Sequence, residues 1–198
     1  MTAKAEISGR ETLLEAACQL FLEDGYDAVS MQQIAEAAGM TKGAPYYHFR
    51  NKDDLFMQVF VLSIERLKSG FASQLEIEGT LDERLKRAMV YIFRTTQGDL
   101  SRLFSDFERY LSVSCKADLK MSALDHGNMV SGLIPFFEEA AVRGEFSRVT
   151  PARAAYLFIL LTMGQLQWIR FQQFTPDLVE TPESMADELV GVLLNGIR

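Results

Sequence analysis

The side chains best suited to contacting a partner lie close together between residues 41 and 52. They comprise three basic residues, two tyrosines and a histidine, namely Lys42, Tyr46, Tyr47, His48, Arg50 and Lys52. No acidic residue occurs from position 37 to position 52. Because ammonium, guanidinium and phenol groups donate hydrogen bonds to phosphate oxygens and base edges, the stretch is suited to a nucleic acid rather than to catalysis.

Two short helices around a glycine turn are the elements expected to position these side chains. Ser30 and Gln33 fit a capping box, so a helix should begin at about Met31. Gly39 permits the left-handed backbone that ends a helix, and Thr41 is placed to cap the next one. This is the helix-turn-helix pattern, whose second helix enters the major groove of DNA.

The tip of the second helix would consist of Lys42, Gly43 and Ala44. The glycine and the alanine are small enough for the backbone to approach the duplex, while the lysine can donate to a guanine edge or to a phosphate. The alternative is that the tyrosines are packing residues and the charges an ordinary solvated surface. The caps and the turn glycine beside them favour the first interpretation.

A third helix precedes this pair. Ser8 and Glu11 form a second capping box, and Gly25 should end the helix that it opens. The result is a three-helix head, which is too small to be robust alone and should pack onto the helices C-terminal to it.

The string IAEAAGMTKGAPYYHFRNKDDLF, residues 34–56, resembles the DNA-binding signature of TetR-family transcriptional regulators. The resemblance is specific over about residues 8–60 and extends beyond them only in length and helical organisation. It implies DNA contacts by Thr41, Lys42, Gly43, Ala44, Tyr46, Tyr47, His48 and Lys52. Those of Tyr46 and Lys52 should be chiefly to phosphates, and Ser30 matches a further phosphate-contacting position.

Pro45 departs from the family, which commonly has Leu, Ile or Phe at this position. With Thr41 counted as the cap, the proline falls in the first turn but later than the position it prefers. We therefore expect one helical hydrogen bond to be lost, with some strain. Base preferences cannot be copied from relatives.

The composition of the 198 residues fits a globular protein. The net charge of the whole chain, −7, argues against DNA binding. Residues 53–198, however, carry 15 basic and 20 acidic side chains, so most of the excess of acidic residues lies outside the head.

The two cysteines and two histidines have no metal-ligand spacing, so we expect no disulfide, metal or cofactor. With no apolar leader or membrane-spanning run, the protein is expected to be cytoplasmic.

The rest of the chain has helical patterns, so the expected fold is all-α. It comprises a three-helix head over residues 1–52 and a larger helical ligand-binding and dimerisation domain over residues 53–198. Helices are expected over about 53–75, 80–98, 100–111 and 128–143, and after the Thr-Pro pairs at 150–151 and 181–182. Residues 112–127 read as a mobile connection, and Pro135 should kink its helix or be accommodated by bending.

The last two helices offer apolar faces. Residues 154–163, AAYLFILLTM, are apolar almost all round, as in a helix buried in a core or against another subunit. The resemblance implies that these two helices form a four-helix homodimer interface with their symmetry mates. Two heads would then read an inverted-repeat operator with half-sites about 34 to 36 Å apart, or at a greater spacing.

An effector would bind in the body of the protein. Pockets are mostly apolar with a few orienting polar groups, which favours an apolar or aromatic small molecule. The candidate lining residues are Phe104, Phe107, Tyr110, Met129, Phe137, Gln165 and Trp168. The alternative for each is an ordinary role in the core.

The function that these features favour is a ligand-released repressor of transcription. Ligand would displace the long helix after the head, so that the spacing of the two heads no longer matches the operator. An activator or a DNA-organising protein of the same fold remains an alternative. A helical enzyme is less favoured, because no Ser/His/Asp, Cys/His or HExxH arrangement occurs.

Overall fold

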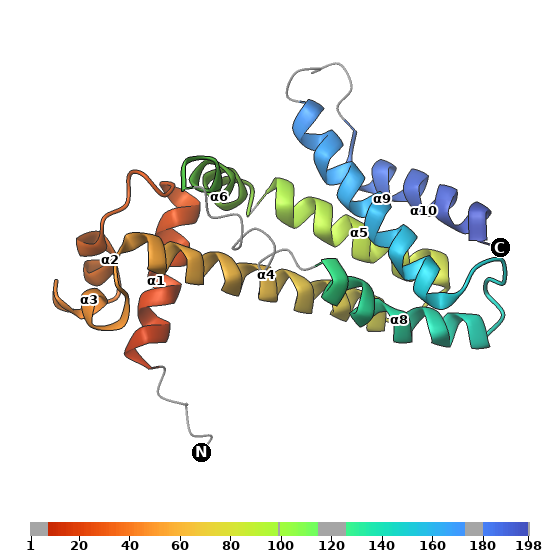
Figure 1. Cartoon of the computed structure of the whole chain (residues 1–198), viewed down its shortest axis with the longest axis horizontal. Helices are drawn as coiled ribbons and strands as arrows, with labels where there is room; N and C mark the ends of the chain where they lie inside the picture. The colour runs from red at the N-terminus through yellow and green to blue at the C-terminus, as the bar shows by residue number, and fades with distance from the viewer. Residues whose placement is uncertain (1–7, 99, 115–125, 173–179, 198) are drawn as a thin grey trace. The chain divides into compact units, whose positions relative to one another are not determined.

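The computed structural model describes residues 8–98, 100–114, 126–172 and 180–197. Every regular element within these ranges is an α-helix, which confirms the expected fold class (Figure 1). The helices are α1 (Gly9–Glu23), α2 (Met31–Ala37), α3 (Ala44–His48), α4 (Lys52–Glu76), α5 (Leu81–Gln97), α6 (Ser101–Ser114), α8 (His126–Val142), α9 (Pro151–Gln172) and α10 (Pro182–Ile197).

The chain divides into two compact units. The first comprises Met1–Arg66 and Thr96–Ala117, and so holds α1 to α3, the first part of α4, and α6. The second comprises Leu67–Thr95 and Asp118–Arg198, with the rest of α4, most of α5, and α8 to α10. The long helix α4 therefore contributes residues to both units.

Local signals set the ends of the first helices. The Ser8 hydroxyl accepts the Glu11 N–H, and the Glu11 carboxylate accepts the Ser8 N–H at 2.9 Å, so the predicted capping box is confirmed. The second predicted box closes in the same way at the start of α2. Gly25 and Gly39, with φ of 85° and 67°, follow the two helices in the left-handed region that favours glycine.

Aromatic side chains from α1, α4 and α6 form the core of the first unit. Phe21 of α1 meets Phe56 of α4 edge to face, with ring centroids 5.3 Å apart. Phe60 of α4 stacks on Phe107 of α6, with centroids 3.6 Å apart. All four side chains are buried. Each contributes about 1.5–3 kcal/mol of apolar burial, so the small head is stabilised by packing against α4 and α6.

The second unit has its own aromatic core, in which α8 and α9 form an extensive pair. Phe137 of α8 and Phe158 of α9 are fully buried, with ring centroids 6.3 Å apart. The predicted starts of α9 and α10 are confirmed, because the hydroxyls of Thr150 and Thr181 accept backbone N–H groups of the first turns.

Two arginines of α5 stabilise the end of α4 within the second unit. Arg84 Nε donates to the Leu75 carbonyl at 2.6 Å, and Arg87 donates to the carbonyls of Ile77 at 2.7 Å and Glu78 at 3.2 Å. The last carbonyls of a helix have no intrahelical partner and carry partial negative charge, so guanidinium groups are favourable there.

The predicted ends of the connection between α6 and α8 were wrong. It was expected over residues 112–127, but α6 continues to Ser114 and α8 begins at His126. Residues 115–125, which made up most of that connection, lie outside the described residues. Pro135 lies inside α8 and does not end it, since the helix continues to Val142.

Helix α9 is not buried on all sides within the single chain. Tyr156 and Leu160 are 42% and 47% exposed, whereas Ala155, Phe158 and Ile159 are buried. One face of the helix therefore packs in the second unit, and the other carries exposed apolar groups. Within the described ranges, no helix combines the length and apolar character needed to cross a membrane.

Candidate nucleic-acid interface

The helix-turn-helix consists of two short helices that are anchored from within. Met31, Ile34 and Ala35 of α2 are buried, as is Pro45 of α3. The turn between the helices is tied to α2, because the Met40 N–H donates to the Ala35 carbonyl at 2.8 Å. The outer side chains of the turn are therefore not needed to hold its backbone.

Most residues expected to contact DNA lie on the outer surface of this unit. The exposed ones are Ser30, Thr41, Lys42, Gly43, Tyr46, Tyr47 and His48, whereas Ala44 and Lys52 are partly buried. The rings of Tyr46 and Tyr47 are 59% and 87% exposed, so neither is a packing residue. Lys42 has no hydrogen bond or ion pair with any described residue. The side-chain donors of Lys42, Tyr46 and Tyr47 thus remain available to a partner.

The predicted cap of the second helix is wrong. The N-cap of α3 is Gly43, and the Thr41 carbonyl instead accepts the Ala44 N–H at 2.9 Å in a preceding turn. Pro45 is then the second residue of the helix, where an N–H would have no intrahelical acceptor. The expected loss of a helical hydrogen bond is therefore also wrong, and the proline fits the first turn.

Ser30 is engaged in the cap of α2. Its hydroxyl accepts the Gln33 N–H at 3.2 Å and lies 2.7 Å from the Gln33 side-chain oxygen. A phosphate contact by this hydroxyl would have to compete with the bond to that oxygen. The backbone N–H of Ser30 is likewise taken by Gln33 at 2.8 Å.

The start of α4 is organised by a reciprocal pair that the sequence reasoning missed. The Asn51 side chain accepts the Asp54 N–H at 2.8 Å, and the Asp54 carboxylate accepts the Arg50 N–H at 2.9 Å. The bond from Arg50 holds the pKa of Asp54 below its usual value, helped by Gln58. The Asn-x-x-Asp spacing was the available signal, and it fixes the helix that begins at Lys52.

Lys52 lies beside Tyr26 rather than extending into solvent. Its Nζ is 4.2 Å from the centroid of the Tyr26 ring. Burial lowers the pKa of Lys52, while the carboxylates of Asp27, Asp53 and Asp106 act in the opposite direction. Tyr26 and Asp106 carried no functional signal in the sequence, because they are 80 residues apart.

Three of the candidate effector residues lie on α6 in the first unit. Phe104 and Phe107 pack on Phe60, with centroids 5.5 Å and 3.6 Å away, and Phe107 is only 2% exposed. Tyr110 lies 6.1 Å from the ring of Phe56. Phe107 thus belongs to the core of the first unit, whereas Phe104 and Tyr110 are partly buried beside it.

The other four candidates lie on α8 and α9 in the second unit. Phe137 is fully buried among aromatic rings, whereas Met129 is half-buried. Trp168 is 39% exposed. The side-chain nitrogen of Gln165 is buried and has no hydrogen-bond partner among the described residues. The Gln165 side chain thus has a hydrogen-bond donor that a ligand could use, whereas Phe137 packs in the core of the second unit.

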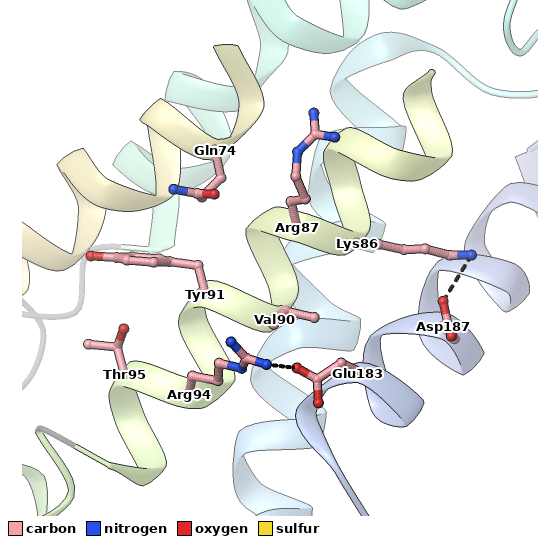
Figure 2. Close-up of a pocket in the computed structure, with 9 residues that line it drawn as sticks. All are labelled: Gln74, Lys86, Arg87, Val90, Tyr91, Arg94, Thr95, Glu183 and Asp187. Atoms are coloured by element: carbon pink, nitrogen blue, oxygen red, sulfur yellow. Dashed lines mark hydrogen bonds and ion pairs between the residues drawn. The ribbon is translucent and has the colours of Figure 1, made fainter. Parts of the chain in front are cut away.

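A groove of about 430 Å³ lies in the second unit (Figure 2). It is lined by Gln74, Lys86, Arg87, Val90, Tyr91, Arg94, Thr95, Glu183 and Asp187. Lys86 pairs with Asp187 at 3.0 Å and Arg94 pairs with Glu183, as the dashed lines in Figure 2 show. The groove contains none of the predicted effector residues, and the acids of α10 largely neutralise its cations.

The described residues offer no metal centre. They contain no group of three or more histidine, cysteine, aspartate or glutamate side chains that could hold an ion. His48 is exposed in the head beside Tyr47, with ring centroids 5.1 Å apart. The chemistry available at this face is hydrogen bonding and charge.

A sequence-family match covers most of the head and the start of α4. The family described as "Bacterial regulatory proteins, tetR family" matches residues 13–59. The HTH-type transcriptional regulator AcrR of Shigella flexneri is 44% identical over 54 residues, which are 27% of this chain and 25% of AcrR. The chain spans from a quarter to about half the length of the first curated relatives that it matches.

Solved structures resemble the chain over nearly all its length. A TetR-family protein from Mesorhizobium loti has a TM-score of 0.75 and 23% identity, over 99% of this chain and 98% of its own. AibR, solved in complex with isovaleryl coenzyme A and operator DNA, has a TM-score of 0.57 and 26% identity, over 94% of this chain and 98% of its own. The fold is therefore shared beyond the head.

Proposed function

Because the chain belongs to the TetR family of bacterial regulatory proteins, we propose that it regulates transcription by binding double-stranded operator DNA through its helix-turn-helix. The family is one of regulators and not of enzymes, so the enzymatic alternative is set aside. The observation that carries the proposal is the exposed face of α3 and the preceding turn, where Lys42, Tyr46 and Tyr47 leave their donors available.

The proposed contacts divide between bases and backbone. Lys42, with the small residues Gly43 and Ala44, approaches the major groove, where an ammonium group can donate to guanine. Tyr46 and Lys52 bind phosphates, which set the register and orientation of the head. Further contacts come from Ser30, Thr41, Tyr47 and His48. Residues 1–52 act as the DNA-binding domain, and residues 53–198 bind ligand and dimerise.

The proposed dimer forms through α9 and α10. Besides Tyr156 and Leu160, Trp168 of α9 and Val192 of α10 are 39% and 58% exposed. A second copy would bury such side chains in a two-fold interface and present two heads to an inverted repeat. Leu160→Glu should therefore produce monomers in sedimentation, whereas Val142→Glu, at a residue of α8 that is 89% exposed, should not. An unchanged dimer in Leu160→Glu would exclude this interface.

The proposed effector is an apolar or aromatic small molecule, and its binding releases DNA. The similarity to AibR, solved with isovaleryl coenzyme A, makes short acyl thioesters a reasonable first panel of compounds. Release would follow if ligand displaced α4 and changed the separation of the two heads. A complete reversal from 1:99 to 99:1 requires the ligand to favour the released state by about 5.5 kcal/mol.

The test of DNA binding is fluorescence anisotropy with the DNA flanking the gene at a stated salt concentration. Tyr46→Ala and Lys52→Ala are compared with the native chain, and Lys68→Ala on α4 is the control outside the head. Selective binding that is lost in the first two variants and kept in the third supports the proposal. Equal, salt-labile binding of all four proteins to every duplex would contradict operator recognition.

The alternatives of the same fold differ in where they bind and in what they do there. A regulator should occupy one or a few promoter sites, whereas a DNA-organising protein should occupy many sites away from promoters. Mapping of bound sites separates the two. Transcript levels of the neighbouring genes after deletion of this gene then separate repression, which predicts an increase, from activation, which predicts a decrease.

A further inference from the structure

Tyr26 lies in the turn after α1 and is held by contacts from two other helices of the first unit. Its ring meets Phe56 of α4 and Tyr110 of α6, with centroids 4.8 Å and 6.3 Å away. Its hydroxyl donates to Asp53 at the start of α4. Its backbone N–H donates to the carboxylate of Asp106 on α6 at 2.7 Å. Both the ring and the backbone of Tyr26 are thus fixed.

The fixed ring lies beneath the ammonium of Lys52. The separation of 4.2 Å between Nζ and the ring centroid is within the range of a cation–π interaction. A lysine side chain on an open surface has many rotamers, and ordering it on binding costs affinity. A ring that holds the ammonium beforehand removes part of that cost.

Asp106 connects this pair to α6. Its side chain is buried and accepts from both Tyr26 and Arg109, the latter at 2.6 Å. Arg109 also pairs with Asp27 of the same turn at 2.9 Å. The turn that carries Tyr26 is therefore attached to α6 by charged hydrogen bonds, in addition to apolar packing.

We propose that Tyr26 is a positioning residue for DNA binding, whose ring holds the Lys52 ammonium in reach of a phosphate while Asp106 of α6 holds Tyr26 in place. This inference rests on the proposed function, in which Lys52 binds the DNA backbone. Tyr26 need not touch DNA, because it acts through the lysine. A displacement of α6 would reach the phosphate contact by this route.

The experiment compares the full-length native chain with Tyr26→Phe and Tyr26→Leu. The probe is a duplex selected by the native protein from a random-sequence pool, and anisotropy is measured over a salt series. Tyr26→Phe keeps a ring beneath Lys52 and should bind as the native chain does. Tyr26→Leu should bind about three- to tenfold more weakly and lower the salt slope by up to about 0.9 per head, as expected for a lost phosphate contact.

A double mutant shows whether Tyr26 acts through Lys52. Tyr26→Leu should cause no further loss of affinity in a Lys52→Gln background. Phe60→Leu is the matched control, since it removes a buried aromatic ring of the same unit that pairs with Phe104 and Phe107 and not with Tyr26. It should lower the unfolding temperature and leave the salt slope unchanged.

Each contrary result overturns the inference in a recognisable way. Equal weakening by Tyr26→Leu with and without Lys52 means that the tyrosine acts on the fold alone. Unchanged binding means that the ring is not needed, and tighter binding means that it withholds the ammonium from DNA. If Lys52→Gln itself binds with native affinity and salt slope, the proposed phosphate role of Lys52 fails and the inference fails with it.

Discussion

Lys42 in the head and Lys86 in the second unit are both surface lysines, but their surroundings differ. Lys86 pairs with Asp82 at 2.8 Å and with Asp187 at 3.0 Å, which raises its pKa. Lys42 has no such partner among the described residues, and no acid lies near it in the sequence. A cation paired within its own chain stabilises that chain, whereas an exposed cation without such a partner can pair with another molecule.

The same contrast holds for the arginines of the second unit. Arg143 pairs with Glu139 and Glu145 at the end of α8. Arg84 donates to the Leu75 carbonyl of α4, and Arg87 donates to the Ile77 carbonyl just after that helix. The pairs of Arg143 are local, whereas Arg84 and Arg87 hold α5 to the end of α4. The number of basic residues is thus a weaker guide to a DNA-binding surface than the presence or absence of their partners.

The largest expected effect comes from reversing the charge of each lysine. Lys42→Glu should weaken DNA binding by about 100-fold, because a donor to DNA is lost and a negative charge faces phosphates in both heads. Lys86→Glu should leave DNA affinity unchanged and lower the free energy of unfolding by about 1 kcal/mol. Anisotropy and urea unfolding measure the two quantities. Equal losses of DNA affinity would break the comparison.

The next effect distinguishes a buried carboxylate from an exposed one. Asp106→Ala leaves the Tyr26 N–H without its acceptor and should lower the free energy of unfolding by about 1–3 kcal/mol. Asp187→Ala removes an exposed partner of Lys86 and should cost less than about 1 kcal/mol. Asp106→Asn keeps an acceptor for the N–H and should retain part of the stability. If the two alanine variants were equally stable, Asp106 would have no special structural role.

Two glycines provide a matched pair with a smaller effect. Gly39 in the head and Gly144 after α8 have φ of 67° and 73°, and an added Cβ would meet no atom within 4 Å at either position. Alanine should cost each unit roughly 1 kcal/mol through backbone conformation alone. Only Gly39→Ala should also weaken DNA binding, because Gly39 shapes the turn before Lys42. Weakening by Gly144→Ala would show that stability alone sets affinity.

The smallest effect concerns pH. The pKa of Asp54 is lowered by the backbone hydrogen bond from Arg50, and that of Glu83 in the second unit by the one from Thr80. A lowered folded-state pKa stabilises the protein above the unfolded-state value and loses that contribution as pH falls through the folded-state value. The native chain should therefore unfold at a higher urea concentration than Asp54→Asn or Glu83→Gln at neutral pH. This difference should become smaller as the pH is lowered to about 3. A constant difference would contradict the assignment.

Much of the head could be predicted because its signals are local. Ser8 and Ser30 bond to groups three residues away, and Gly25 and Gly39 adopt left-handed φ values at the ends of their helices. Each of these features depends on residues within one helical turn. The order of helices around the turn, and hence the candidate DNA-facing residues, followed from the sequence for that reason.

The cap of the second helix was predicted wrongly because two nearby residues could serve, and the contacts of inward-facing rings depend on residues far away in the chain. Thr41 and Gly43 were both possible N-caps of α3. The structure has Gly43 as the N-cap, with Pro45 buried in the first turn of the helix. Phe107 and Phe137 are buried against Phe60 and Phe158, and their proposed contact with an effector stays a prediction. Periodicity shows that a side chain faces inward and does not show what it meets there.

The sequence by itself determined the helical fold, the caps and turns of the head, and a stretch that has basic side chains and no acidic ones. These properties depend on composition and on neighbouring residues. Tertiary structure alone decided that Lys86 also pairs with Asp187, that Lys42 has no such distant partner among the described residues, and that Tyr26 contacts both Lys52 and Asp106. Such pairings join residues far apart in the chain, and only the packing of helices brings them within a few ångströms.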